Sequence, residues 1–428
     1  MLSRMEYDSI GALNVPAEAY YGVQSMHAAT NFQITHRLLH PVLIDSIVMV
    51  KKAAAITNEK SGKLDQQIAQ AIIQACDEIL DGNLRDQFIV DAIQGGAGTS
   101  ANMNANEVIA NRAIEILGGT KGDYSIVHPN DHVNMSQSTN DVIPTAGKIT
   151  VLKLLPQTIK ELEKLEKAME EKEAEFDDIL KMGRTQLQDA VPMRLGQSFG
   201  AFAHVLKRDI KRLKNVMDEM KVLNIGATAI GTAINVDPYY LANISYELSK
   251  VAGISLKQAD DLIDATQNLD GFVSVSGVLK TCAVDISKIS NDLRLMSSGP
   301  RTGLSEINLP ARQNGSSIMP GKINSVIPEV VSQVAYLIIG HDYTITMAAE
   351  AGQCEEYIEK SVGISTALCP YIGYAKSAEI AKKSLKTGIS VKELVLEEGL
   401  LKEEELKEIL KPEKMTQPMR EKVMKAVS

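Results

Sequence analysis

Apolar residues recur at helical spacing through most of the chain, whereas the alternating pattern of β-strands is scarce. In residues 206–220 the apolar positions follow one another at intervals of four and three: Leu206, Ile210, Leu213, Met217 and Met220. Lysines and arginines lie off this stripe, as in a helix with one face against a core. Similar stripes occupy residues 155–176 and 286–296. Because the stripes are narrow and near heptad spacing, they predict long helices packed side by side at shallow angles.

These patterns predict an all-α, mainly helical fold with three domains. Residues 1–138 mix short helical segments with glycine- and asparagine-rich loops, residues 139–353 form a central bundle of long helices, and residues 354–428 form a smaller domain of short charged helices. Pro156 falls inside one stripe, where proline either kinks a helix or lies in its first turn. Each stripe is interpreted first as core packing, and a bundle of this kind also has stripes that other subunits can cover.

Composition narrows the functional classes. The chain has 428 residues and a net charge of −9, which argues against binding to nucleic acid or to an anionic membrane surface. No apolar stretch is long enough to span a membrane, and no signal peptide is visible. The cysteines are far apart and lack CxxC spacing, which disfavours a disulfide framework or a structural zinc site: Cys76, Cys282, Cys354 and Cys369. We therefore expect a soluble cytoplasmic protein.

Three loops are rich in small hydrogen-bonding side chains. The first, "GGAGTSANMN" at 95–104, leads into a helical pattern, and glycines before a helix start let backbone N–H groups approach an anion. It lacks the spacing of nucleotide-binding motifs, so a structural turn is an equal alternative. The second, at 128–141, contains Ser138, Thr139 and Asn140, three successive donors that can contact a carboxylate. A cap for the following helix is the alternative there.

The second loop also contains His128, Asp131 and His132 at helix-compatible spacing. No third strong ligand is identifiable beside the two histidines, so the sequence does not predict a metal site.

The third loop is "GSSIMPGKIN" at 315–324. Lys322 supplies a positive charge and Asn324 a paired donor and acceptor, while the glycines and the proline favour a mobile loop that closes over a ligand. The alternative is an ordinary surface loop. Together the three loops offer hydroxyls, amides and one lysine, a set that suits a small dicarboxylate better than a phosphate or a peptide.

Several ordered segments resemble motifs of the fumarase/aspartase superfamily of lyases. They cover nearly the whole chain: "YDSIGALNVPAEAYYGVQS", "GAGTSANMNANEV", "NMSQSTND", "GRTQLQDAVP", "SSGPRTGLSEINLP" and "GSSIMPGKIN". The resemblance implies a homotetramer whose central helices form one multi-helix core. It also implies active sites built from three subunits, which explains why the polar loops lie far apart in sequence.

Within the superfamily, "LQDAVP", "ATAIGT", "NDLRLMSSGPR" and "AAEAGQ" favour an ammonia-lyase acting on L-aspartate over a fumarase. Gln186 stands where many relatives have histidine. Loss of hydroxide from malate benefits from an acid, whereas the protonated amine of aspartate leaves as neutral ammonia, so a non-titrating glutamine can suffice. The alternatives are a fumarate hydratase or another fumarate-releasing lyase and, from a different class, a non-catalytic helical scaffold on a lyase fold.

The resemblance also implies roles for individual residues. Ser316 is the base that removes a proton from Cβ of aspartate, which gives an aci-carboxylate intermediate. The residues expected to bind the substrate are Thr99, Ser100, Ser138, Thr139, Asn140, Thr185, Gln186, Ser317, Lys322 and Asn324, and Glu329 is expected to support Gln186. No organic cofactor or catalytic metal is expected, and activation by a divalent cation is left open.

Three features depart from the family pattern. His27 stands where relatives generally have arginine, so a charge near the substrate is either missing or dependent on pH. Ser325 replaces a common proline, which loosens the loop hinge. After "AAEAGQ" the family continues into another long helix, but here Gln353 is followed directly by "CEEYIEKSVGI". Either the bundle lacks that helix and leaves apolar stripes uncovered, or the sequence omits the stretch.

Overall fold

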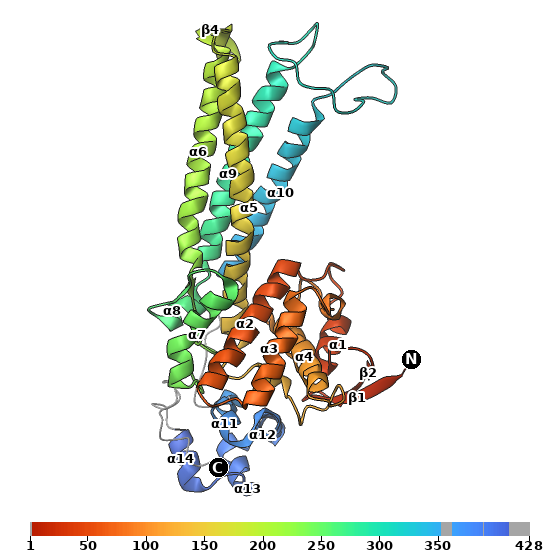
Figure 1. The fold of residues 1–428 in the computed structure, drawn as a ribbon, viewed down its shortest axis with the longest axis vertical. Helices are drawn as coiled ribbons and strands as arrows, with labels where there is room; N and C mark the ends of the chain where they lie inside the picture. Colours follow the sequence, from red (N-terminus) through yellow and green to blue (C-terminus); the bar gives the residue numbers. More distant parts are fainter. Residues whose placement is uncertain (1, 352–361, 388, 411–428) are drawn as a thin grey trace. The chain divides into compact units, whose positions relative to one another are not determined.

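The computed structural model describes residues 2–351, 362–387 and 389–410. The described residues are mainly helical, with three small two-stranded sheets, so the predicted fold class is confirmed. They form two compact units, one within 1–150, 221–268 and 352–428 and the other from 151–220 and 269–351 (Figure 1). The expected division into three domains stays a prediction.

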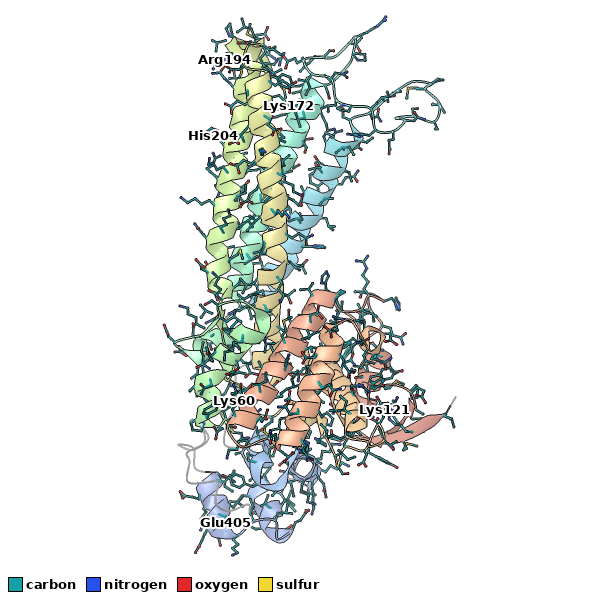
Figure 2. The ribbon with its side chains drawn as sticks, viewed as in Figure 1. Lys60, Lys121, Lys172, Arg194, His204 and Glu405 are labelled. Atoms are coloured by element: carbon teal, nitrogen blue, oxygen red, sulfur yellow. The ribbon has the colours of Figure 1, made fainter. Side chains whose placement is uncertain are left out.

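The core of the first unit lies between four helices: α2 (Pro41–Lys60), α3 (Gln66–Leu80), α4 (Thr99–Ile116) and α7 (Pro238–Ala252). Helix α2 packs against both α3 and α7, and α3 packs against α4. Ile47, Ile72 and Ile109 are fully buried there. At the end of α2, the Lys60 ammonium lies 2.8 Å from Oε1 of Glu247 on α7 (Figure 2).

The N-terminal part of this unit is an antiparallel hairpin, β1 (Ser3–Tyr7) and β2 (Ala12–Pro16), followed by α1 (Val23–Asn31). Two buried carboxylates stabilise the start of α1. Glu107 on α4 accepts hydrogen bonds from the N–H groups of Gly22, Gln24 and Ser25, and Glu6 accepts one from the Val23 N–H. Carboxylates at a helix N-terminus satisfy free N–H groups and complement the helix dipole.

Short elements complete the unit. Strands β5 (Val222–Leu223) and β6 (Lys257–Gln258) form a parallel pair, and the remaining short helices are η1 (Arg85–Gln87), η2 (Pro129–Val133) and α8 (Leu262–Gln267). The C-terminal elements pack around a small apolar core: η3 (Val362–Leu368), α11 (Cys369–Ile372), α12 (Tyr374–Thr387), α13 (Val391–Glu397) and α14 (Glu403–Ile409).

The second unit is a bundle of long helices, as the narrow stripes predicted (Figure 1). It contains α5 (Thr139–Glu175) from residue 151 onward, α6 (Leu195–Met220), α9 (Asp270–Met296) and α10 (Val326–Glu350). On α6 the stripe residues Leu206, Ile210 and Leu213 are buried. Because α5 begins at Thr139, Pro156 lies in the helix interior and not in a first turn.

One end of the bundle carries the antiparallel hairpin of β3 (Leu180–Thr185) and β4 (Gln188–Arg194). Within the bundle, the Asp342 carboxylate of α10 accepts a hydrogen bond from Ser276 Oγ at 2.8 Å and pairs with the Lys280 ammonium at 2.6 Å, both on α9. Along α10, large apolar side chains remain exposed in the single chain, among them Val330, Val334, Tyr336 and Leu337. None of the described helices combines the length and apolar character needed to cross a bilayer.

Candidate functional site

Thr99 and Ser100 form the first turn of α4. The preceding Gly98 has a φ of +87°, and a Cβ there would lie 3.0 Å from the Ile143 side chain on α5. Glycine is therefore required at this position for both its backbone conformation and the close approach of α5. The Thr99 hydroxyl donates to the Gly96 carbonyl at 2.7 Å. The structure thus brings the start of α4 beside the first turns of α5.

Ser138, Thr139 and Asn140 lie at the start of α5, where Ser138 Oγ accepts the Asn140 N–H at 3.3 Å. The expected cap and the expected donor cluster are therefore one local structure. The Asn140 amide donates to the Ala229 carbonyl at 2.7 Å, which leaves its Oδ1 available as an acceptor. Buried Asp141 accepts the Ser138 N–H at 2.8 Å, and its other oxygen accepts the N–H groups of Gly226 and Thr228.

Lys51 on α2 is fully buried beneath this loop. Its ammonium donates to Oδ1 of Asn134 at 2.8 Å and to Oε1 of Gln137 at 3.0 Å. Burial lowers the pKa of Lys51 to about 7, against the opposing effect of the Asp141 carboxylate. Burial likewise raises the pKa of Asp141 to about 6, against its hydrogen bonds and the nearby Lys51. Sequence analysis did not identify Lys51 or Asp141, although a lysine inside the apolar run "IVMVKKAAAI" was a signal.

Thr185 and Gln186 lie at the tip of the β3–β4 hairpin, in the second unit. Gln186 and Leu187 both have positive φ, the geometry of a type I′ turn between paired residues Thr185 and Gln188. Gly183 allows the strands to approach, because a Cβ there would lie 2.8 Å from the Val191 carbonyl oxygen. The Glu306 carboxylate contacts the hairpin through Lys181 at 3.0 Å and Arg184 at 2.5 Å. Glu306 is a further residue that sequence analysis missed.

The 315–324 loop is closed at its base. The Gly315 N–H donates to the Lys322 carbonyl at 2.8 Å, and the Asn324 amide donates to the Gly315 carbonyl at 3.1 Å. A Cβ at Gly315 would lie 2.6 Å from Asn324 Oδ1, so only glycine permits this closure. Inside the loop, Ser316 Oγ accepts the N–H groups of Ile318 at 3.3 Å and Met319 at 3.1 Å. The loop therefore directs backbone N–H groups at the hydroxyl oxygen expected to act as the base.

The other residues of this region are solvent-accessible. Ser317 and Lys322 are exposed, and no carboxylate pairs with Lys322 in the part of the chain that the structure describes. Glu329 lies in the first turn of α10, without a hydrogen bond to Gln186 among the described residues. Ser325 precedes α10 without capping it, and its hydroxyl contacts that of Ser297 at 3.1 Å.

The histidines of the first unit have local roles. His27 Nε2 lies 3.6 Å from the Asp8 carboxylate, so its ring faces a residue of the N-terminal hairpin region. His128 Nδ1 accepts the N–H groups of Asn130 and Asp131, and His132 Nδ1 accepts the His128 N–H. These nitrogens cap backbone groups. Across the described residues, no three histidine, cysteine, aspartate or glutamate side chains are grouped so as to hold a metal ion.

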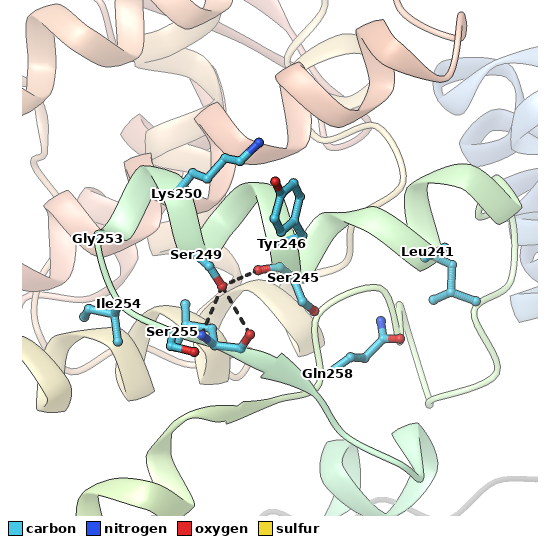
Figure 3. A pocket seen from close by; sticks show the side chains of 11 residues that line it. Leu241, Ser245, Tyr246, Ser249, Lys250, Gly253, Ile254, Ser255 and Gln258 are labelled. Carbon is cyan, nitrogen blue, oxygen red and sulfur yellow. Dashed lines mark hydrogen bonds between the residues drawn. The ribbon is translucent and has the colours of Figure 1, made fainter.

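A shallow cavity of about 630 Å³ lies beside α7 (Figure 3). Ser245, Tyr246, Lys250 and Gln258 are among its lining residues, and Ser249 Oγ bonds the backbone of Ser245 and Leu256 there. None of the predicted substrate-binding residues lines it. The predicted residues instead lie at the starts of α4 and α5 in the first unit, and at the hairpin tip and in the 315–324 loop in the second.

Comparison with known proteins gives these residues a chemical context. Residues 11–340 match the family model described as lyase, and residues 364–417 match that of the fumarase C C-terminus. The chain is 49% identical to an aspartate ammonia-lyase from a Bacillus species over 457 aligned residues, covering 97% of this chain and 98% of the relative. It is 45% identical to the aspartate ammonia-lyase of Escherichia coli, covering 97% and 96%.

Two solved structures share the fold. One is described as fumarate lyase:delta crystallin from Brucella melitensis bound to cobalt, with a TM-score of 0.81, 46% identity and coverage of 97% of this chain and all of that one. The other is a class II fumarase from Schistosoma mansoni, with a TM-score of 0.79, 32% identity and coverage of 98% and 100%.

The 457-residue alignment exceeds the 428 residues of this chain, so the Bacillus relative contains residues without a counterpart here. The junction at Gln353 and Cys354, where the sequence departs from the family pattern, lies outside the described residues. The resemblance inferred from the ordered motifs is confirmed over nearly the whole chain. The chain belongs to the lyase family of the fumarase/aspartase superfamily and, within it, to the aspartate ammonia-lyases, which are carbon–nitrogen lyases.

Proposed function

We propose that the chain catalyses the reversible deamination of L-aspartate to fumarate and ammonia, with Ser316 as the base that removes the Cβ proton. The observation that carries this mechanism is the pair of N–H groups directed at Ser316 Oγ. A serine hydroxyl is normally too weakly acidic to supply a base. Hydrogen bonds to the charged form favour it, so the Ile318 and Met319 N–H groups stabilise the alkoxide.

Proton removal places a second negative charge on the β-carboxylate, and donors directed at this developing charge lower the barrier. We assign that role to Ser317 from the 315–324 loop and to the cluster at the starts of α4 and α5: Thr99, Ser100, Ser138 and Thr139. The two helix N-termini there supply a favourable dipole in addition to the hydroxyls. All of these groups are neutral, so their contribution does not depend on titration near neutral pH.

The α-carbon substituents have separate partners. Lys322 and Asn324 bind the α-carboxylate; Lys322 is available because no described carboxylate neutralises it. Asn140, Thr185 and Gln186 orient the amine and its neighbouring carboxylate, with Glu329 supporting Gln186. Asn140 suits this role because its amide donor is engaged by Ala229 while its Oδ1 remains free to accept from the ammonium.

The assembly we propose is a cytoplasmic homotetramer with active sites shared between subunits. The exposed apolar residues along α10 support it, because a lone subunit would leave them in water. The chemistry assigned to the residues needs no organic cofactor and no catalytic metal, and a divalent cation acts at most as an activator.

The test is ultraviolet absorbance of fumarate, with L-aspartate and L-malate supplied separately to the purified protein. Fumarate from aspartate alone supports the proposal, and fumarate from malate alone makes the protein a fumarate hydratase. If a folded tetramer releases fumarate from neither substrate, the non-catalytic scaffold becomes the better explanation.

A further inference from the structure

We propose that Lys51 is a positioning residue that holds the Ser138–Asn140 donors in register with the N-terminus of α4. Lys51 touches none of the residues assigned to the substrate, and it would act through the loop that precedes α5. The inference rests on the proposed function in so far as those donors bind aspartate.

Helix α2 contacts the loop that precedes α5 at residues 134–137. The Lys51 ammonium donates to side-chain oxygens of Asn134 and Gln137, and Asn134 in turn donates to the Gln137 carbonyl at 3.1 Å. About two turns further along α2, the Asn58 amide donates to the Met135 carbonyl at 3.0 Å. Residues 134–137 are therefore attached to α2 at two points immediately before Ser138.

The same loop is also hydrogen-bonded to α4. Oδ1 of Asn134 also accepts the amide groups of Asn102 and Asn106, each at 3.2 Å. Asn102 lies one turn after Thr99 and is 2% exposed. A single amide oxygen is thus shared by α2 and α4, and the Lys51 charge strengthens its hydrogen bonding. Both donor clusters of the first unit depend on this buried junction.

The buried Lys51 ammonium also requires electrostatic compensation. Burying a lysine is unfavourable unless hydrogen bonds or an opposite charge compensate its ammonium. Here the compensation comes from amide oxygens and from the buried Asp141 carboxylate, which itself accepts the Ser138 N–H. Lys51 thus holds the loop through Asn134 and Gln137, and Asp141 holds it through the Ser138 N–H, so both restrain the loop without entering the site.

The experiment compares Lys51→Met with Lys52→Met in the tetrameric enzyme. Lys52 is the matched control, because its ammonium pairs with Asp77 on α3 and contacts none of the loop. Lys51→Met should lower kcat for L-aspartate by about tenfold to a hundredfold, the scale expected for small misplacements of catalytic groups, with a smaller change in KM. Lys52→Met should leave both constants within about twofold.

A double-mutant cycle distinguishes a positioning role of Lys51 from a purely structural one. If Lys51 acts through the loop, Lys51→Met should cost much less in a Thr139→Ala background than in the wild type. Additive losses, or a Lys51→Met enzyme that behaves like Lys52→Met, would overturn the inference. Should Lys51→Met not fold, Gln137→Met removes one acceptor only, and the same pattern at smaller amplitude is expected; wild-type kcat in that variant would also overturn it.

Hydrogen exchange separates this inference from the proposed function. Lys51→Met should speed amide exchange in residues 134–141 and in the first turn of α4, whereas Lys52→Met should not. If the wild type releases no fumarate from aspartate, the proposed function fails, yet the exchange comparison still decides whether Lys51 positions the loop. Unchanged exchange in these segments would overturn the inference in an active enzyme.

Discussion

Individual side chains in this protein acquire their chemistry from the backbone around them. Ser316 is proposed as the base because the loop directs two backbone N–H groups at its hydroxyl. The role of His128 also depends on the surrounding backbone, but that role is structural. Its Nδ1 accepts two backbone N–H groups and must remain unprotonated to do so. The residue type alone decides neither role.

Ser316→Ala should lower kcat for L-aspartate by about a thousandfold or more, because the general base contributes on this scale. The hydroxyl is small and partly exposed, so the melting temperature and the mass of the assembly should be retained. The assay is fumarate absorbance on purified protein of verified mass. Substantial residual turnover would place the base at another residue.

The contribution of His128 to the free energy of unfolding should be lost on acidification. Burial lowers the pKa of His128, with Asp131 opposing, so the unfolded chain binds the proton more readily than the folded one. The stabilising contribution is complete above the unfolded pKa of about 6.5 and is lost as pH falls through the lower folded value.

His128→Asn keeps an acceptor for the same N–H groups but does not titrate. Relative to the wild type, its melting temperature should therefore rise on going from about pH 7.5 to about pH 5.5. Equal pH dependence in His128→Asn and the wild type would show that protonation of His128 does not destabilise the fold.

At the scale of elements, the candidate residues lie where helices and strands begin or turn. Thr99 and Thr139 begin α4 and α5, and Gln186 lies in a tight turn with positive φ. Such ends have unpaired backbone groups or strained conformations that need support from elsewhere. Glu306 provides that support for the hairpin through Lys181 and Arg184.

Glu306→Gln should lower kcat/KM for L-aspartate by about tenfold, because a neutral amide cannot compensate the Lys181 and Arg184 charges of the hairpin, and the hairpin tip will be less well placed. Amide exchange in residues 180–194 should accelerate. Asp177→Asn, which removes an exposed ion pair with Arg194 beside the same hairpin, is the control and should change little. If the two variants behave alike, the Glu306 ion pairs do not position the hairpin.

At the scale of the whole molecule, the second unit has more apolar surface than one chain can cover. Val334 and Leu337 on α10 are 51% and 58% exposed. A helix in the middle of a sequence with such a face normally packs against another helix, and the proposed tetramer supplies three further bundles.

Val334→Lys should therefore shift the tetramer toward smaller species, because a charge placed in an apolar interface is strongly destabilising. Light scattering after size-exclusion chromatography measures the mass, and circular dichroism should show that helical content is retained. Gln74→Lys, an exposed change on α3, should leave the mass unchanged. A Val334→Lys protein that remains tetrameric would place the interface on another face.

The sequence by itself determined the helical fold class, the stripes of α6 and the residues of the polar loops. Local periodicity decides which face of a helix is apolar, and a short ordered motif records the chemistry of its loop. These properties depend on neighbours in sequence, so Leu206, Leu213 and Ser316 could all be assigned a place or a candidate role before the structure was known.

Only the tertiary structure identified the residues that act from a distance. Lys51 meets Asn134 across 83 positions, and Glu306 meets Arg184 across 122. No periodicity relates such positions, because the energy of a buried ion or a clamped hairpin depends on which groups surround it in space. It also placed Pro156 inside α5 and showed that Ser138 caps the same helix whose first turn presents the proposed donors. Sequence determines what each segment can form, and the burial and charge brought together by folding decide what holds it in place.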